Sequence, residues 1–433
     1  MGLGNLLTEV ALNGQTYEVS LNFIGRMIRG LIGGVGSVGV GIILFSLILK
    51  FIVMPFDIFQ RISMRKQNIK MRENKDKMEK LQKQYAGNKE LYNKKVMEMY
   101  KTNGISVFSS CLPLILSMVI FFVAIGAFND YSTYSTVNNY NQLVKAYDTK
   151  IETLCKDIKD YNKSEDGIIY IDTEDAIVKF GITNDYINAQ VANGKAEEAT
   201  KRDDAVGIWL EEQAQDAVVI EYETNLKYTT KFLWIKNIWQ TDATYKSPIQ
   251  EYSEFSATIF PTTGCGGCSN AGVDFDNGAG DDVKITELNA KAQKIYSEDN
   301  YNKVTAKLGE QKNQSNGYFI LIVLSVGTIL LQQLFSSKAN KEQQKYSTVD
   351  GQGGSQTKMM MIIMTAMFAI FSFLYSSAFA IYMIMSNVMS IISMFFIHKA
   401  VDIFMEKKEE KAFRAKHDRS FSGKMNNKKD KNK

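Results

Sequence analysis

The sequence predicts an all-α polytopic membrane protein with five transmembrane helices, a cytoplasmic helical hairpin and a large, mainly helical extracytoplasmic insert. Although 23% of the residues are charged, the apolar residues gather in long runs. A run of about 20 such residues is enough for one helix to cross a bilayer. Two basic segments and one long acidic segment flank these runs, and their charges indicate which side of the membrane each segment occupies.

Five apolar runs are predicted to span the membrane. The last two form one continuous stretch that is too long for a single crossing, so we expect it to fold back at Ser376 and Ser377. The spans are placed at residues 36–55, 106–129, 316–335, 358–376 and 377–398.

The first 35 residues are expected to lie on the extracytoplasmic side, and they do not resemble a cleaved signal peptide. Apolar side chains such as Phe23 and Ile28 recur at helical spacing between Asn22 and Gly33. This pattern is typical of an amphipathic helix in the headgroup region. A leader without fixed structure is the alternative.

Basic residues beside the spans set the orientation, because cytoplasmic flanks carry the excess of Lys and Arg. Residues 56–105 hold 13 basic and 6 acidic side chains, and residues 399–433 hold 12 and 6. Residues 130–315 hold 31 acidic and 19 basic side chains. We therefore expect the hairpin, the loop at 336–357 and the C-terminal tail to be cytoplasmic, and the N-terminus and the insert to lie outside.

The segment 56–105 is rich in good helix formers, with a turn signal at Ala86, Gly87 and Asn88. It predicts two antiparallel helical arms that begin near Arg61. The first arm carries Met64, Met71, Met78, Leu81 and Tyr85, which are expected to face Leu91, Met97 and Tyr100 of the second. Exposed methionines accept varied apolar partners, so Met64, Met71 and Met78 are candidates for receiving a hydrophobic substrate. The alternative is that they only hold the two arms together.

Lys50 is the unusual residue, because it lies within the apolar run FSLILKFIVMPF. A lysine at mid-membrane costs about 2.5–3.5 kcal/mol on insertion scales, so its side chain is expected to face water or a partner. Ser46 lies one turn earlier on the same face, and we expect no acidic side chain to neutralise Lys50. The other spans add the polar residues Ser110, Ser117, Gln332, Gln333, Ser386 and Asn387. The alternative is that Lys50 extends to the nearby headgroups.

Three features in one order resemble the core of the YidC and Oxa insertase family. They are LKFIVMPF, then the charged hairpin, then NGISVFSSCLPLILSMVIFFVAIGAF. Further on, LWIKNIW at 233–239 is similar to the outer segment before the next span, and the apolar pair from Lys358 onward is similar to the final two helices. The resemblance covers about half the chain, including all the predicted spans.

The resemblance implies a multi-pass protein of a bacterial plasma membrane, with a hydrophilic groove open to the cytoplasm and a basic residue on the first span. Lys50 occupies that position, where arginine is common in the family. Ser46, Tyr382, Ser386 and Asn387 match polar groove positions, and Cys111 and Pro113 match the start of the second span. Ser117 stands where glutamine is common, and Ser376 to Ala378 replace a proline and glycine.

The implied work is insertion and chaperoning of nascent membrane proteins, without covalent chemistry, cofactor or metal. The expected partners are the ribosome through the basic tail, anionic lipids, and the Sec translocon as a candidate, with a monomer as the working form. A low-complexity basic tail is typical of a disordered arm.

The insert exceeds what the resemblance predicts. Apolar positions at Leu143, Tyr147, Leu154 and Ile158, and a run over 209–226, favour packed helices. Cys265 and Cys268 could form a local disulfide, a redox pair or half a zinc site, or have no role. Two rival functions stay open: a small transporter, and a membrane-anchored receptor with an acidic outer domain.

Overall fold

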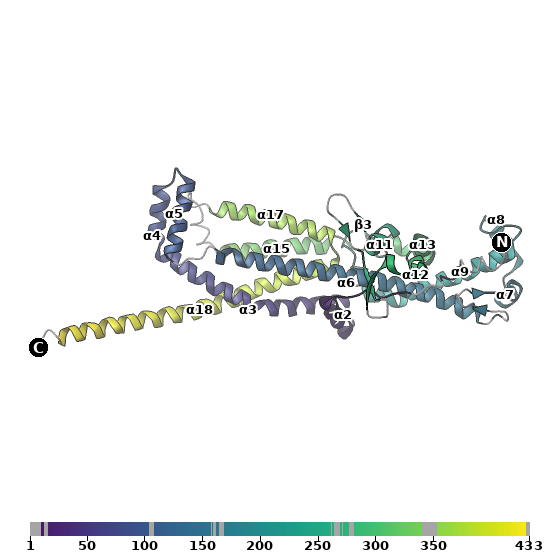
Figure 1. The fold of residues 1–433 in the computed structure, drawn as a ribbon, viewed down its shortest axis with the longest axis horizontal. Coiled ribbons are helices and arrows are strands. Elements are labelled where there is room, and N and C mark those ends of the chain that lie inside the picture. The colour runs from purple at the N-terminus through teal and green to yellow at the C-terminus, as the bar shows by residue number, and fades with distance from the viewer. Residues whose placement is uncertain are drawn as a thin grey trace. The chain divides into compact units, whose positions relative to one another are not determined.

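The computed structural model describes residues 10–12, 16–103, 108–156, 158, 162–163, 169–260, 262–263, 269–270, 272–276, 281–339 and 353–429. The described chain is mostly helical and divides into two compact units (Figure 1). Unit 1 comprises the chain up to Gly41 together with Gly126–Ile320 and Tyr375–Ala378. Unit 2 comprises Ile42–Ile125, Leu321–Leu374 and the chain from Phe379 onward. Cys265 and Cys268 lie outside the described residues.

The apolar helices of unit 2 agree in part with the predicted spans. Three stretches are long and apolar enough to cross a membrane among the described residues: Val38–Ser63, Ile320–Lys338 and Ser377–Lys408. A shorter apolar helix covers Thr365–Leu374. The predicted crossing at 106–129 falls mainly on helix α6 (Phe108–Cys155), and the structure does not describe the side chains of this helix before Val119. Five crossings therefore stay a prediction.

Several helices run past the predicted boundaries. Helix α3 (Val38–Glu73) continues through Pro55 into the segment predicted as the first hairpin arm. Helices α17 (Gly353–Leu374) and α18 (Ser377–Lys429) confirm a break immediately before Ser377. The backbone of α18 stays helical as far as Lys429, so the expectation of a disordered basic tail was wrong for that part.

The predicted hairpin consists of α4 (Lys75–Gln84) and α5 (Lys89–Thr102), antiparallel in Figure 1. The turn falls where predicted, because the Asn88 side chain accepts a hydrogen bond from Leu91 N at 3.0 Å and caps α5. The first arm is shorter than expected, since the chain breaks at Asn74. The core holds Met78, Tyr92 and Val96, with Leu81, Tyr85, Met99 and Tyr100 packed around them.

Unit 1 contains helix α2 (Phe23–Val35), so the predicted helix after Asn22 is confirmed. The Asn22 side chain caps its first turn by accepting from Gly25 N at 2.7 Å, and Gly36 ends it with a φ of 71°. A Cβ at Gly41 would lie against Ile32, so this glycine allows α2 to pack on the start of α3.

The rest of unit 1 is the insert, built on the second half of α6. Leu143, Tyr147 and Ile158 are buried as the sequence predicted, while Leu154 is half-buried. Cys155 is a buried free thiol, and burial raises its pKa to about 12. The further elements are β1 (Asn162–Lys163), β2 (Ile169–Tyr170), α7 (Thr173–Phe180), α8 (Asn184–Ala192), α9 (Lys201–Glu221), η1 (Tyr222–Leu226), α10 (Lys227–Thr230), α11 (Tyr252–Ile259), β3 (Thr262–Thr263), β4 (Ser269–Asn270), β5 (Asp274–Asp276), β6 (Asp282–Lys284), η3 (Ile285–Glu287), α12 (Ala290–Ile295), α13 (Glu298–Thr305), η4 (Ala306–Leu308) and α14 (Gly309–Lys312).

Two buried polar residues hold the loop that leads out of the insert. Asn316 is fully buried; its side chain donates to the carbonyls of Asn237 and Thr241, both at 2.9 Å, and accepts from Asn237 N at 2.7 Å. Asp242 is 1% exposed and accepts from Tyr318 N at 2.6 Å. These hydrogen bonds offset the cost of removing the polar groups of Asn316 and Asp242 from water.

Candidate functional site

Lys50 lies in unit 2 on α3, and its side chain is only 11% exposed. Its ammonium Nζ lies 2.7 Å from Asp57 Oδ2 on the same helix and 3.0 Å from Ser390 Oγ on α18. The expectation that no acidic side chain neutralises Lys50 was therefore wrong. Asp57 follows Lys50 by seven residues, about two helical turns, which brings the two side chains to one face.

A second charged group follows on the same face of α3. Arg61 Nη2 lies 3.4 Å from Asp402 Oδ1 on α18, and Arg65 Nε lies 3.6 Å from the same oxygen. Arg61 is 9% exposed, and its Nε and Nη1 have no hydrogen-bond partner among the described residues. Lys50, Asp57, Arg61 and Arg65 with Asp402 form what we call the charged stripe. Three cations against two anions leave it one positive charge in excess.

Neutral polar side chains link the other helices of unit 2. Ser325 on α15 (Ile320–Ala339) and Ser372 on α17 lie 2.8 Å apart through their hydroxyls, and Thr365 donates to Gln333 Oε1 at 3.0 Å. Asn387 on α18 donates to Thr328 at 3.3 Å. Between membrane helices such bonds contribute about 0.6 kcal/mol each on average. They link α15 to α17 and to α18.

The remaining predicted groove residues have mixed surroundings. Ser46 is buried, and its hydroxyl donates to Ile42 O at 2.7 Å, within its own helix. Tyr382 is 3% exposed and hydrogen-bonded to Ser386, whose carbonyl also accepts from Ser390 Oγ at 2.7 Å. Gln332 is half-buried. The side chains of Ser110 and Ser117 lie outside those that the structure describes.

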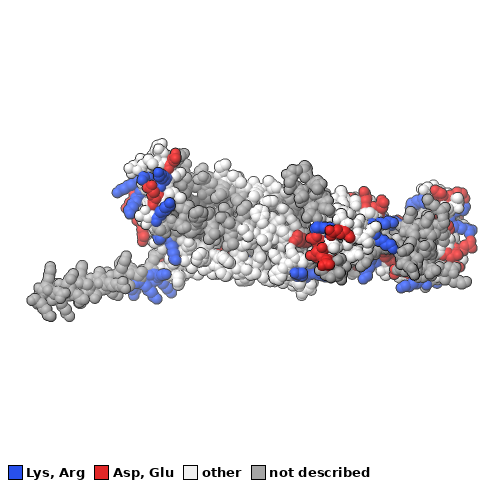
Figure 2. All heavy atoms as spheres, viewed as in Figure 1, with Lys and Arg blue, Asp and Glu red and all other residues white. Residues whose placement is uncertain are grey.

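The three methionines proposed to receive substrate differ in what the structure describes of them. Met78 is completely buried, so it belongs to the core rather than to a surface that receives substrate. The side chains of Met64 and Met71 are outside the described part. On the second arm, Tyr100 packs against the core as predicted, whereas Leu91 is 38% and Met97 45% exposed. Burial raises the pKa of Tyr100 to about 12. Blue atoms in Figure 2 show Lys and Arg gathered on this hairpin.

Sequence reasoning did not identify five site residues, which are Asp57, Arg61, Arg65, Ser390 and Asp402. The signal for Asp57, Arg61 and Arg65 was their spacing from Lys50, which keeps all of them on one side of a helix that continues past Pro55. Asp402 and Ser390 come from a helix about 340 residues later. No local pattern could have paired them with α3.

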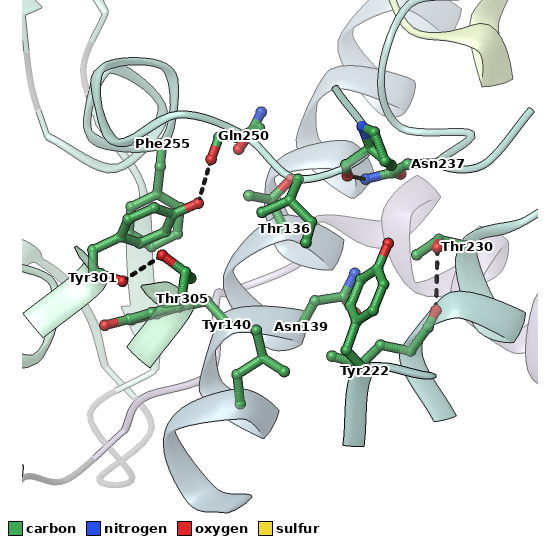
Figure 3. Close-up of a pocket in the computed structure, with 14 residues that line it drawn as sticks. Thr136, Asn139, Tyr140, Tyr222, Thr230, Asn237, Gln250, Phe255, Tyr301 and Thr305 are labelled. Carbon is green, nitrogen blue, oxygen red and sulfur yellow. Dashed lines mark hydrogen bonds between the residues drawn. The ribbon is translucent and has the colours of Figure 1, made fainter. Parts of the chain in front are cut away.

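The insert contains a small cavity of about 60 Å³, drawn in Figure 3. It is lined mainly by uncharged polar and aromatic side chains, among them Tyr140, Tyr222 and Phe255. Tyr301 donates to Gln250 O at 2.6 Å at its edge. The volume suits a few water molecules and is too small for a peptide segment.

Comparison with known families places the chain. A family described as 60Kd inner membrane protein matches residues 30–171 and 286–406, which is more than half of the sequence. The chain belongs to this family. The resemblance to the YidC and Oxa insertases is thereby confirmed, and the chain is a bacterial membrane protein. Residues 172–285, the centre of the insert, lie outside the match to the 60Kd inner membrane protein family.

Curated relatives are similar over part of their length. The membrane protein insertase YidC of Caldanaerobacter subterraneus subsp. tengcongensis is 28% identical over 116 residues, which is 27% of this chain and 54% of the relative. That of Fusobacterium nucleatum subsp. nucleatum is 27% identical over 110 residues, 25% of this chain and 52% of the relative. That of Clostridium perfringens is 34% identical over 105 residues, which is 23% of this chain and 42% of the relative.

The chain therefore spans about half the length of these relatives of the 60Kd inner membrane protein family. No solved structure matches the chain.

Proposed function

We propose that this protein inserts nascent membrane proteins into the bilayer and helps them fold, through a hydrophilic groove around Lys50 that opens to the cytoplasm. Membership of the 60Kd inner membrane protein family supports this function. The relatives named above are membrane protein insertases. The observation that carries the proposal is the largely buried Lys50 ammonium, held by Asp57 and Ser390 within a helix long enough to span a membrane.

The physical task is to move a short polar tail across a low-dielectric layer. Each bare charge or unpaired backbone group there costs several kcal/mol. Polar partners within the inner leaflet shorten the path that remains. The charged stripe supplies them in order, from Arg65 and Arg61 to Lys50, along one face of α3.

Asp57 is the partner of Lys50 in the protein without a client. While no client is present, its carboxylate balances the Lys50 charge at 2.7 Å. An acidic residue in a client tail can take the place of Asp57 on the ammonium, and the excess positive charge of the stripe favours that exchange. The apolar part of the client then enters lipid along the apolar helices.

The partners follow from the same mechanism. The hairpin would receive the client, the basic tail would contact the ribosome, and basic side chains near the surface would bind anionic lipids. The Sec translocon is a candidate partner, and one copy of the chain would suffice. In this arrangement the N-terminus and the insert lie outside and the C-terminus in the cytoplasm.

Charge reversal at Lys50 tests the proposal. Cells depleted of their own protein would carry the wild type, Lys50→Glu or Lys50→Arg, and insertion of matched clients with acidic or basic tails would be measured by protease protection. We expect Lys50→Glu to reverse the preference for acidic tails and Lys50→Arg to retain it. Equal insertion of acidic-tailed clients by Lys50→Glu would overturn the proposed role of this cation.

A further inference from the structure

The insert contains a second cavity of about 370 Å³, which is lined by charged side chains, whereas the lining of the small cavity is uncharged. We call it the lysine pocket; its lining includes Lys227, Lys231, Lys236, Glu223, Trp234 and Gln311. Three lysines against one glutamate give it two positive charges in excess. This excess is notable in an insert that holds 31 acidic and 19 basic residues. A cationic cavity of this size suits an anion larger than a simple ion.

The polar groups of the lysine pocket are incompletely paired. Lys227 binds Glu223 at 2.6 Å, and Glu223 also accepts from Gln311 Nε2 at 2.9 Å. Within the part of the chain that the structure describes, Lys231 and Lys236 have no ion pair. The Trp234 Nε1–H and Gln311 Oε1 are buried without a hydrogen-bond partner there. Unpaired buried groups of this kind are uncommon, and a bound ligand in the pocket would satisfy both of them.

These groups match the chemistry of one headgroup. Two ammonium groups and an indole N–H are donors for the oxygens of a phosphodiester, and the Gln311 carbonyl oxygen is an acceptor for a hydroxyl. A phosphoglycerol headgroup carries both a phosphodiester and hydroxyl groups. A choline headgroup instead places a cation where the lysines already lie.

The position of the pocket indicates a lipid source rather than a free phosphate. Tyr318 lines the pocket and precedes by two residues the apolar stretch Ile320–Lys338. Leu233 is 61% and Tyr318 58% exposed, so apolar and aromatic surface borders the cationic cavity. Aromatic and basic side chains together are typical of the membrane interface. Leu233 has a φ of 54°, an unusual conformation for leucine that directs the chain at the pocket edge.

We propose that the lysine pocket binds the phosphoglycerol headgroup of an anionic phospholipid, at the end of α15 that is predicted to face outside. This site is separate from the charged stripe, the hairpin and the basic tail, and it does not depend on the proposed insertion activity. Lys231 and Lys236 bind the phosphate, Trp234 donates to it, and Gln311 accepts from a glycerol hydroxyl.

The test measures binding of short-chain lipids to the purified full-length protein by calorimetry. The ligands are dihexanoylphosphatidylglycerol, dihexanoylphosphatidylcholine, glycerol 3-phosphate and inorganic phosphate. The paired variants are Lys231→Gln/Lys236→Gln in the pocket and Lys179→Gln/Lys294→Gln, which removes two exposed lysines of the same unit elsewhere. Circular dichroism and gel filtration confirm that each variant is folded, and Lys231→Arg/Lys236→Arg keeps the charge.

We expect phosphatidylglycerol to bind more tightly than the other three ligands. The pocket variant should lose about 30-fold in affinity, and Trp234→Phe about tenfold. The exposed-lysine variant and the arginine variant should stay within about threefold of the wild type. Equal losses in both lysine variants would show charge attraction without a site, and equal binding of phosphatidylcholine would exclude headgroup recognition. Tighter binding of inorganic phosphate or glycerol phosphate would assign the pocket to a soluble anion. Each of these three results would overturn the proposal.

Discussion

The ammonium of Lys50 lies 2.7 Å from the carboxylate of Asp57, two turns further along the same helix. The cation of the proposed groove thus has an anion of its own within a single element. An arrangement of this kind stabilises the lysine charge in an apolar helix and allows another carboxylate to replace Asp57 as its partner.

Replacing Asp57 by Asn should release Lys50 for clients. A partly exposed ion pair is worth up to about 1 kcal/mol, so we expect acidic-tailed clients to crosslink to residues beside Lys50 about fivefold more strongly. Photocrosslinking yields in membrane vesicles measure this effect. Asp76→Asn on the exposed face of the hairpin removes the same charge and should leave the yield unchanged. An unchanged or lower yield with Asp57→Asn would show that this carboxylate does not compete with clients.

Asp402→Ala should destabilise unit 2, because it leaves the buried Arg61 guanidinium without a carboxylate. Loss of such a partner costs about 1–3 kcal/mol, which thermal unfolding of the detergent-solubilised protein would detect. Glu410→Ala breaks the exposed pair with Arg414 and should cost no more than about 0.5 kcal/mol. If the two variants unfolded at the same temperature, the Asp402 pair would be no more than a surface contact.

Met78→Ala should loosen the hairpin, because a fully buried methionine leaves a cavity costing about 2–5 kcal/mol. Hydrogen exchange of α4 and α5 measures the effect directly. Met97→Ala removes an exposed side chain and should change stability by less than about 0.5 kcal/mol. Reduced client crosslinking in Met97→Ala with normal exchange would identify Met97 as the methionine that contacts substrate. Normal exchange in Met78→Ala would argue against the packed core.

Asn316→Ala should weaken the loop that joins the insert to α15. Its side chain forms three hydrogen bonds in a fully buried position, and their loss costs about 1–3 kcal/mol. Limited proteolysis would show faster cleavage after Asn237 or near Lys312. Asn313→Ala, an exposed neighbour, is the control and should be cleaved at the wild-type rate.

Local patterns in the sequence predicted those features of the fold that depend on a single helix or its ends. The amphipathic helix after Asn22, the turn at Asn88 and the break before Ser377 all follow from capping, turn residues or length. The same approach failed at Pro55 and in the basic tail. A proline ends a helix less reliably when neighbouring helices support the backbone, and helix formers such as Lys and Glu extend α18 beyond the apolar stretch.

The site was less predictable because it depends on contacts between distant helices. Lys50 and its polar surroundings were visible from the cost of burying a charge. Ser390 and Asp402 were not, since only the packing of α18 on α3 brings them near. The lysine pocket was hidden for the same reason, as Gln311 and Lys231 are far apart in the sequence. Charge counts described the insert as acidic and gave no sign of a local cationic cavity.

Helix α18 has no break between Ser377 and Lys429. Its 53 residues make a rod of about 80 Å. A large particle attached near the far end would act on a long lever arm, so a small tilt there becomes torque at Ser390, beside Lys50. Binding of a particle near Lys429 would then be linked mechanically to the geometry beside Lys50 through one continuous helix.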